Sequence, residues 1–574
     1  MVVAIRSLIF LTLPALGACT KFQTPFRFTK SANITTENVE YSPNVTEFYK
    51  FKSSGLQLQF QLPVDLPWYS NGSAADVEER NDERVRDYGS YTEDDDDEWE
   101  MFAEYFDADV YDSDDEVDSD ADVKDEEIEE DEDDDETKEQ QPKAEEDTPI
   151  EESSDEDDEA SEEDEQLDED TPSNSEPATS GKFDYRTQKI NGINLGGWLV
   201  TEPFISPSLY EQASVGGTEA GTPVDEYSLC RSLGPTVAYE RLKKHWDTWI
   251  TEADIAQIKA FGFNAVRLPI GYWAFARLPT DPYVFGQEEY LQKTIEWCRI
   301  HGLKLWIDLH GIPGSQNGFD NSGQRDVYMW MDPQINFDLG IHVLQYIFDK
   351  YGGPEYADVI IGYENLNEPL HNRYPIPNII DFDQTTYKMF REKSTNWFVY
   401  HDAFLPAGFW NTVLNEPEYV DTVLDHHRYE VFDTTQLRES TDGHITSMKL
   451  LVQDWLKLPK IQIVGEWSAA LTDCCKWLNG VGRGARYDNT FSGNGVIGQC
   501  RFSNDHSKMT DTDKINTRRI IEAQLDLYNQ TNGFFFWTYK TESAIEWSMK
   551  DLAALGLFPQ PLSDRKFARA SVSV

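Results

Sequence analysis

Apolar runs alternate with stretches of helical periodicity from about residue 183 to the C-terminus. Short β-branched or aromatic runs predict strands, and apolar positions three and four residues apart predict amphipathic helices between them. The eight predicted strands span 190–195, 264–268, 304–309, 359–366, 396–401, 420–426, 461–465 and 533–537. The predicted helices include 238–260, 288–300, 337–350, 446–458 and 511–528. This alternation predicts a (β/α)8 TIM barrel with enlarged loops over residues 181–574.

A doubly wound open sheet is the alternative arrangement of the same elements. That fold binds dinucleotides at a Gly-x-Gly-x-x-Gly turn after its first strand, and no such turn follows 190–195. The cysteines and histidines also lack the Cys-x-x-Cys or matching His spacing of a metal site. We therefore expect neither a cofactor nor a metal.

The region 71–180 differs sharply in composition from the rest of the chain. Residues 91–170 hold 46 Asp plus Glu against three Lys, which accounts for 43 of the 57 net negative charges. So much like charge with so little apolar content predicts disorder, because folding could not bury enough surface to offset the lost entropy. This region is expected to be a solvated spacer, or a polyanion that binds Ca²⁺ or basic wall components. No basic patch is present, which argues against nucleic acid as a partner.

The N-terminus has the features of a secretory signal peptide. Arg6 precedes the apolar run 8–16, and small residues follow, so residues 1–18 are the predicted signal. The run is shorter than the roughly 20 residues of a membrane span, so no stable membrane insertion is expected. In the N-terminal extension, 19–70, the alternating segment 56–62 forms a short strand or nothing stable. Secretion to the extracellular space or the cell wall follows.

Cysteines in an exported chain are free to form disulfides. Adjacent Cys474 and Cys475 lie on one side of a Gly-rich loop and Cys500 lies on the other. We expect a bridge from this pair to Cys500 that pins the loop. The sequence does not say which of the two adjacent cysteines forms it.

Two predicted strands end in a glutamate. The apolar run 359–366 leads to Glu368, and the run 461–465 leads to Glu466. Because the C-terminal ends of all barrel strands meet at one face, both carboxylates are expected in one hollow there. Cleavage of a glycosidic bond requires two such carboxyls, one as proton donor and one as nucleophile or base. Glu364 is the nearest rival of Glu368, but it lies about 13 Å lower on its strand and is expected to be a paired structural acid.

The roles of the two acids follow from their expected neighbours. A carboxylate beside Arg267 and Tyr429 stays ionised and can attack as a nucleophile, which suits Glu466. Glu368 is expected near carbonyl and imidazole groups, where it can hold a proton at acidic pH. Whether the pair retains or inverts configuration depends on its separation, which the sequence does not give.

Several motifs together resemble the fungal exo-β-1,3-glucanase group of glycoside hydrolase family 5. They are NGINLGGWLVTEPF (191–204), VRLPIGYW (266–273), DLHG (308–311), GFDNSG (318–323), NEP (367–369), DHHRYEVF (425–432), GEW (465–467) and FWTYKTE (536–542). The resemblance covers residues 185–560. It implies a (β/α)8 barrel and a retaining mechanism with Glu368 as acid/base and Glu466 as nucleophile.

The resemblance also implies which residues bind the sugar. Those that would line the site around the cleaved sugar are Arg267, His310, Asn321, Asn367, His427 and Tyr429. Glu202 would hydrogen-bond hydroxyls of the terminal glucose, and Trp537 would form a platform beneath it. Phe319 and Phe432 would clamp the next sugar. The chain departs from the family's usual Tyr, His and Trp at Phe204, Arg428 and Tyr539.

The leading hypothesis is a secreted, monomeric retaining exo-β-1,3-glucanase that releases glucose from non-reducing ends of cell-wall β-1,3-glucan. An endo-acting β-glucanase or a transglycosylase of the same fold would use the same two acids. From a different class, a non-catalytic wall-binding protein would have a broken acid pair, whereas both glutamates are present.

Overall fold

The computed structural model describes residues 183–491 and 495–572, and the backbone of two short strands at 48–53 and 56–61. The predicted signal peptide 1–18, the acidic region 71–180 and most of the extension 19–70 lie outside the described residues. The short strands are β1 (Phe48–Ser53) and β2 (Leu56–Gln61), which pair antiparallel. The sequence pattern favoured at most a strand like β2, and β1 was not predicted.

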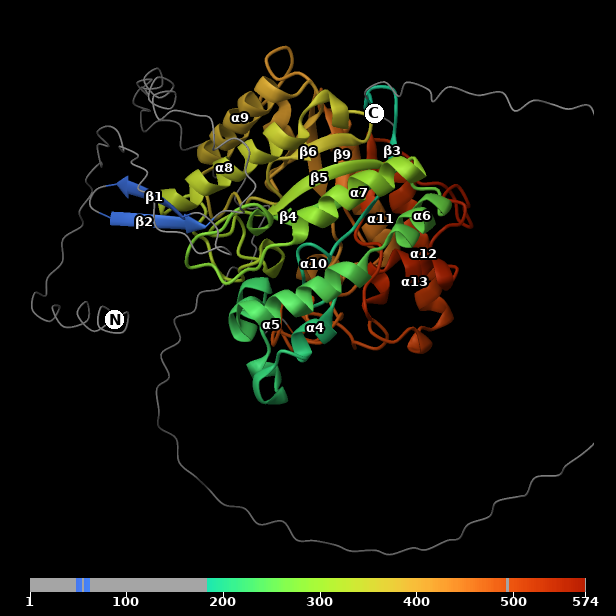
Figure 1. Cartoon of the computed structure of the whole chain (residues 1–574). Coiled ribbons are helices and arrows are strands. Elements are labelled where there is room, and N and C mark those ends of the chain that lie inside the picture. The colour runs from blue at the N-terminus through green and yellow to red at the C-terminus, as the bar shows by residue number, and fades with distance from the viewer. Residues whose placement is uncertain (1–47, 54–55, 62–182, 492–494, 573–574) are drawn as a thin grey trace, which may run out of the picture. The chain divides into compact units, whose positions relative to one another are not determined.

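Eight parallel strands close into a barrel (Figure 1). They are β3 (Ile190–Asn194), β4 (Ala265–Gly271), β5 (Lys304–Gly311), β6 (Ile360–Glu364), β7 (Phe398–His401), β8 (Thr422–His427), β9 (Ile461–Glu466) and β10 (Gly533–Phe536). Their order around the barrel follows the sequence, and β10 closes the ring by pairing with β3. The predicted TIM barrel is confirmed, and each predicted strand overlaps an observed one.

Helices surround the strands on the outside of the barrel (Figure 1). They are α4 (Pro207–Glu211), α5 (Glu226–Trp249), α6 (Glu252–Ala260), α7 (Gln287–His301), α8 (Gln334–Tyr351), α9 (Ile376–Lys393), α10 (Thr434–Leu437), α11 (Thr441–Trp455), α12 (Asp511–Tyr528) and α13 (Met549–Ala554). Within the described ranges, none of them combines the length and apolar character that a membrane crossing requires.

The single helix predicted at 238–260 is wrong in its extent, because the structure has two helices there. Asp225 caps the start of α5, where its side chain accepts a hydrogen bond from the backbone N–H of Ser228. Thr251 then caps α6 by accepting one from the backbone N–H of Asp254. Such capping residues satisfy the free N–H groups of a helix start, so they break the chain into two helices despite continuous apolar periodicity.

The inside of the barrel is layered. Alternate side chains of each strand point inward, so successive inward residues are two positions apart. A lower layer is apolar and contains Ala265, Trp306, Val423 and Phe535. Two residues further along β4, β5 and β8 come Arg267, Asp308 and Asp425, all fully buried. The apolar layer therefore forms a floor on which a charged layer lies, just below the C-terminal ends of the strands.

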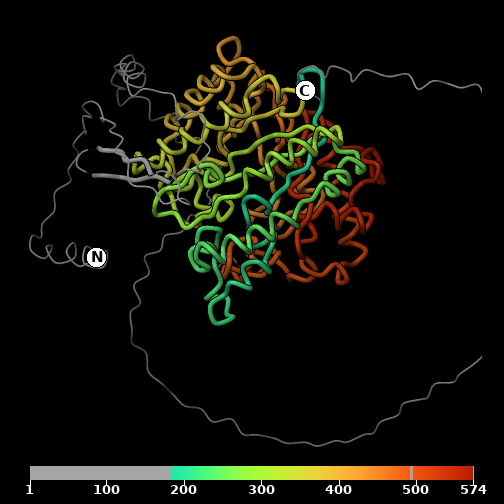
Figure 2. Tube along the Cα trace, in the orientation of Figure 1, coloured from blue at the N-terminus to red at the C-terminus, as the bar shows by residue number. Residues whose placement is uncertain are grey.

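The last part of the chain packs against the outside of the barrel near α6 (Figures 1 and 2). The hydroxyl of Tyr539 donates to Asp254 at 3.1 Å, and Lys540 and Lys550 form ion pairs with the same carboxylate. The departure at Tyr539 therefore serves this packing contact with α6.

A second buried polar group lies between β6, β7 and α9. Asn365 donates a hydrogen bond to Oδ1 of Asp383 at 2.8 Å. The other oxygen of Asp383 and the hydroxyl of Tyr400 have no hydrogen-bond partner, although both are buried. Burial raises the pKa of Asp383 to about 8, because the uncharged form is favoured away from water. Asp383 is therefore protonated at neutral pH.

This raised pKa predicts how stability depends on pH. An unfolded aspartate loses its proton near pH 4, whereas folded Asp383 keeps it until about pH 8, so the free energy of unfolding falls as pH rises across this window. At pH 7 the cost is on the order of 4 kcal/mol. Asp383→Asn keeps the hydrogen bond from Asn365 without the ionisation, so we expect the variant to exceed the wild type in stability at pH 8 and to match it near pH 4.

Urea denaturation at pH 4, 6 and 8 measures this difference. Asp381→Asn, on the exposed face of the same helix, is the matched control and should keep the slope of the wild type. Equal pH slopes for Asp383→Asn and the wild type would contradict the prediction.

Candidate active site

The predicted site residues gather at one end of the barrel. Arg267 lies in the middle of β4, and the others lie in the last two residues of a strand or in the loop that follows it. They are Glu202 after β3, then His310, Phe319 and Asn321 of β5 and its loop, and Asn367 and Glu368 after β6. The rest are His427, Tyr429 and Phe432 of β8 and its loop, Glu466 of β9, and Trp537 after β10. Parallel strands with one register bring these distant residues to the same face.

Glu466 ends β9 and is held from two sides. Arg267 donates to its Oε1 and the hydroxyl of Tyr429 donates to its Oε2, both at 2.7 Å. Burial raises the pKa of Glu466, against the positive charges of His427 and Arg267, which lower it. Each carboxylate oxygen thus has a fixed donor, which orients the carboxylate and favours its charged form.

Glu368 follows β6 in a conformation that few side-chain residues adopt. Its φ is 47°, in the left-handed region, which costs of order 1–3 kcal/mol for such a residue. The carboxylate accepts hydrogen bonds from His427 at 2.8 Å and from Asn321 at 3.3 Å. Burial alone would raise the pKa of Glu368, but the hydrogen bond and charge of His427 outweigh it and lower the pKa.

His427 lies between the two glutamates. Its Nδ1 is 2.8 Å from Glu368 and 3.5 Å from Glu466, so the two carboxylates are no further apart than the sum of these distances. That bound is below the roughly 6.5–9.5 Å of inverting glycosidases and admits the roughly 5–5.5 Å of retaining ones. The geometry fits a retaining pair.

The ring of His427 carries a proton at this position. Burial would lower its pKa, but the carboxylates of Glu466 and Asp425 raise it well above the usual value. A protonated ring can donate from both nitrogens, to Glu368 and to Asp425. The proton of the hydrogen bond between His427 and Glu368 therefore lies on Nδ1 of His427, 2.8 Å from the Glu368 carboxylate.

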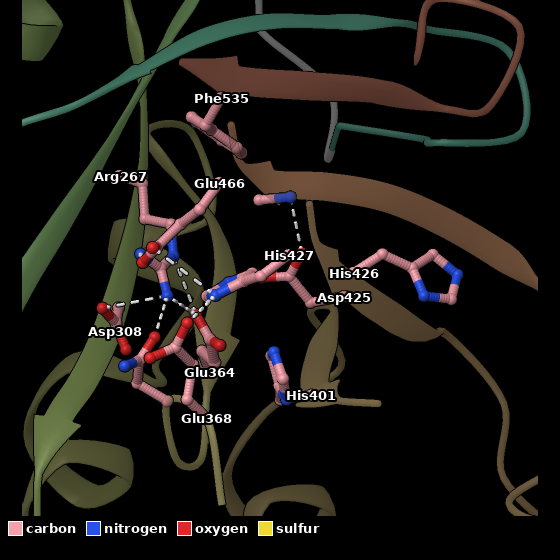
Figure 3. Close-up of polar contacts among 12 residues, drawn as sticks. Arg267, Asp308, Glu364, Glu368, His401, Asp425, His426, His427, Glu466 and Phe535 are labelled. Carbon is pink, nitrogen blue, oxygen red and sulfur yellow. Dashed lines mark hydrogen bonds and ion pairs between the residues drawn. The ribbon is translucent and has the colours of Figure 1, made fainter. Parts of the chain in front are cut away.

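Arg267 joins Glu466 to the acids of the charged layer (Figure 3). Besides Glu466, its guanidinium donates to Glu364, Asn194 and Asn367 at 2.8–3.1 Å. It also forms an ion pair with Asp308 at 3.1 Å. Glu364 is accordingly a paired acid within the barrel and not a second candidate at its mouth. His426, by contrast, points away from this cluster (Figure 3).

Unpaired polar atoms mark the space above the glutamates. Buried atoms without a hydrogen-bond partner include Glu202 Oε1, His310 Nε2, Asn317 Nδ2, Asp320 Oδ2, Asn321 Oδ1 and Asn367 Nδ2. Most buried polar groups in proteins are satisfied, so such a concentration indicates a place for ligand hydroxyls. Trp537 lies beside these atoms, with its ring stacked on His310 at 5.5 Å.

Two of these residues were missed by the sequence analysis, Asn317 and Asp320. Burial raises the pKa of Asp320 to about 7 and that of Glu202 well above its usual value. The like charge of Asp320 adds to the effect of burial and raises the pKa of Glu202 further. The available signal was position, because Asp320 lies between the predicted residues Phe319 and Asn321.

Aromatic side chains form the rim of the site. Phe319 and Phe432 are 40% and 43% exposed, unusually open for rings of this size. A further tryptophan, Trp547, was also missed, and its ring lies 5.1 Å from Tyr429 and 5.4 Å from Phe204. It supports Tyr429 from behind.

The departure at Arg428 is also explained by its contacts. Its guanidinium donates to Glu430, which in turn is bonded to His444, while its backbone N–H donates to the carbonyl of Glu466. The side chain thus serves a buried ion pair, and only the backbone touches Glu466.

Two triplets of side chains have the donor atoms of a metal site. They are Glu368, His401 and His427, and Glu364, Asp425 and His427. Both depend on His427, whose two nitrogens are already bonded to Glu368 and Asp425. The contacts are those of a hydrogen-bonded acid–base network, and the absence of a metal or cofactor stays a prediction.

Comparison with known proteins identifies the family. The family model described as cellulase (glycosyl hydrolase family 5) matches residues 229–481. A glucan 1,3-beta-glucosidase 2 of Wickerhamomyces anomalus is 47% identical over 391 residues, which are 67% of this chain and 91% of the relative. This chain belongs to glycosyl hydrolase family 5.

A second curated relative is similarly close in sequence. The glucan 1,3-beta-glucosidase I/II of Saccharomyces cerevisiae is 45% identical over 66% of this chain and 87% of the relative. Among solved structures, the rutinosidase from Aspergillus niger superposes with a TM-score of 0.53 at 19% identity, over 66% of this chain and all of that one. At that identity the likeness shows the shared fold alone.

The central position of Arg267 predicts a large effect of its removal. Arg267→Gln leaves Glu364 and Asp308 buried without a counter-charge, so we expect the free energy of unfolding to fall by about 3–5 kcal/mol. Denaturant unfolding at pH 7 measures the loss. Arg391→Gln is the matched control, because Arg391 bonds only backbone carbonyls and should cost much less. A loss no larger than that of the control would contradict the role of Arg267.

Proposed function

We propose that this chain is a secreted retaining exo-β-1,3-glucanase that removes glucose from the non-reducing ends of β-1,3-glucan in cell-wall metabolism. The observation that carries the proposal is the position of the His427 imidazole between two glutamates. Its Nδ1 is 2.8 Å from Glu368 and 3.5 Å from Glu466. The names of the relatives supply the substrate class. The shape of the site supports the exo action.

Three loops close the site on the side of Glu202 and Asp320. They follow β3, β5 and β9, and the disulfide between Cys474 and Cys500 pins the third. Arg325 donates through its backbone N–H to Asp225 of the first loop, and through its side chain to the carbonyl of Val481 of the third. Arg483 and Asp326 form a further ion pair between the second and third loops at 2.7 Å.

The indole N–H of Trp477, in the loop after β9, donates to Glu219, in the loop after β3, at 2.6 Å. This hydrogen bond also joins the first and third loops. A site closed in this manner has room for a chain end and not for a chain that continues past it. This favours release of single terminal sugars over internal cleavage.

In the first step the sugar is transferred to the enzyme. Glu368 passes the proton that it shares with His427 to the glycosidic oxygen, the bond from that oxygen to the anomeric carbon breaks, and the shortened glucan leaves with a new hydroxyl. An oxygen of Glu466 forms a bond to the anomeric carbon. Tyr429 and Arg267 hold the Glu466 carboxylate in place for this attack.

In the second step water releases the glucose. Glu368, now a carboxylate, takes a proton from water, and the water oxygen bonds to the anomeric carbon as Glu466 leaves with the bonding electrons. Two displacements at one carbon restore the original β configuration. The charge that Glu466 loses in the first step lowers the pKa of Glu368, which suits its change from acid to base.

The remaining site residues have roles in binding. Trp537 offers a ring face to the apolar side of the sugar, and Glu202 with Asp320 takes the hydroxyl rim. His310, Asn321 and Asn367 add further hydrogen-bonding groups with unpaired atoms. Phe319 and Phe432 clamp the sugar on the leaving side.

The alternatives use the same fold differently. An endo-acting β-glucanase would need an open groove where the three loops meet. Transfer of the glucosyl unit to another sugar requires only that an acceptor hydroxyl replaces water in the second step, so it accompanies hydrolysis at high acceptor concentration. A non-catalytic wall-binding protein would not need two glutamates joined through His427.

The proposed location is outside the cell. A structural disulfide forms and persists in an oxidising compartment, in agreement with the predicted signal peptide. We propose that the enzyme acts as a monomer, without a metal or a cofactor, and that β-glucan chains are its partners.

Product analysis on laminari-oligosaccharides tests the proposed function. We expect glucose as the only sugar released from the non-reducing end, and nuclear magnetic resonance should show the β anomer first. Glu466→Gln removes the nucleophile and should release no glucose, with at least a 10⁴-fold loss in kcat. Products of mixed length, or an α anomer formed first, would overturn the exo or the retaining part respectively.

The charge of His427 predicts a pH effect. His427 lowers the pKa of Glu466, which must be ionised to attack. His427→Gln removes that charge, so the pKa of Glu466 rises and the acid limb of the kcat/KM profile moves to higher pH. His426→Gln is the control, because His426 bonds Asp402 and Gln462 and faces away from the acids. An acid limb that does not move in His427→Gln would contradict the assignment.

A further inference from the structure

An exposed tyrosine and an arginine lie together beside the candidate site. The guanidinium carbon of Arg373 is 4.5 Å from the ring centre of Tyr328, and Tyr328 is 37% exposed. Tyr328 belongs to the loop after β5 and Arg373 to the loop after β6. These two loops also carry Phe319 and Glu368, so the pair lies on the catalytic face of the barrel.

Hydrogen bonds within and between the two loops hold the backbone around the pair, and the Tyr328 ring packs against Gly318. The backbone N–H of Asp326 donates to the carbonyl of Gly318 at 2.8 Å. The Tyr328 ring lies so close to Gly318 that a Cβ added there would be only 2.4 Å from the ring. Tyr374 donates to the carbonyl of Ser315 at 2.6 Å, which joins the loop of Arg373 to that of Tyr328. A rigid ring loses little entropy when a ligand binds to it.

The position of Glu368 indicates which part of the substrate lies near Tyr328 and Arg373. Glu368 gives its proton to the glycosidic oxygen that departs with the shortened glucan, so the leaving sugars lie on the side of Glu368. Arg373 is five positions after Glu368, so their Cα atoms are at most about 18 Å apart. The Tyr328 ring and the Phe319 clamp lie on neighbouring parts of one loop. The pair is therefore placed beyond the clamp along the leaving glucan.

Among the described residues, the side chain of Arg373 contacts the Tyr328 ring and forms no hydrogen bond. Arg373 is exposed and forms no ion pair there, so its donors are free for hydroxyl groups. Another tyrosine and arginine pair gives the contrast. Arg299 lies 5.7 Å from the ring centre of Tyr356, but it is bound to Asp358 at 2.8 Å. That pair lies before β6, at the opposite face of the barrel.

We propose that Tyr328 and Arg373 form a subsite for the second sugar of the leaving β-1,3-glucan, with Tyr328 as the stacking surface and Arg373 as a donor to its hydroxyls. This inference rests on the proposed function. It makes the enzyme prefer substrates of three or more sugars over laminaribiose, whose leaving part ends at the clamp.

The test compares kcat/KM on laminaribiose, laminaritriose and laminaritetraose. For Tyr328→Ala we expect the ratio of laminaritriose to laminaribiose to fall about tenfold, mainly through KM, and Arg373→Ala should lower it too. Tyr328→Phe keeps the ring and should restore the ratio. Tyr356→Ala, at the opposite face, is the matched control and should keep the ratio of the wild type.

The outcomes separate the two proposals. A ratio that is unchanged in Tyr328→Ala, or an equal loss on all three substrates, overturns the subsite while the exo-glucanase proposal stands. If the wild type releases glucose from none of the three substrates, the proposed function fails and the subsite fails with it.

Discussion

The buried guanidinium of Arg267 is the interaction on which the site depends. Burying Glu364 and Asp308 inside the barrel is expensive unless a counter-charge is close, and Arg267 provides it to both. The same guanidinium donates to Glu466 and Asn367 at the mouth of the barrel. Its planar fork lets one side chain hold several acceptors at fixed angles, which lysine could not do. Neutralisation of the core and alignment of the Glu466 carboxylate thus depend on one side chain.

The pairing of the two glutamates depends on a second constraint, the position of His427. A positive charge between them allows both carboxylates to lie close without strong repulsion. The strained backbone of Glu368 persists because the hydrogen bonds of its carboxylate with His427 and Asn321 hold the residue in place. The separation that distinguishes retention from inversion is therefore set by three residues from three strands, β6, β8 and β9.

The two sides of the barrel mouth differ in their contacts. On the side of Glu202, cross-loop contacts such as that of Arg483 with Asp326 join the loops after β5 and β9. On the side of Glu368, exposed rings such as Phe319 remain available. A closed end and an open end suit a polymer that enters by its terminus and leaves one sugar shorter. The loops after the strands determine this, and the barrel beneath them does not.

The sequence by itself determined the eight strands, the barrel and the two glutamates, because each is a local signal. Alternation of apolar runs, and acids where those runs end, can be read along the chain. It also placed the disulfide between the pair at 474–475 and Cys500. Only the tertiary structure decided that Cys474 is the partner, that helix 238–260 is divided, and that Asp320 and Trp547 belong to the site. The disulfide partner and the places of Asp320 and Trp547 depend on distances between residues far apart in the chain, and the helix is divided by the capping contact of Thr251 with Asp254. Hydrophobic periodicity carries no information about either.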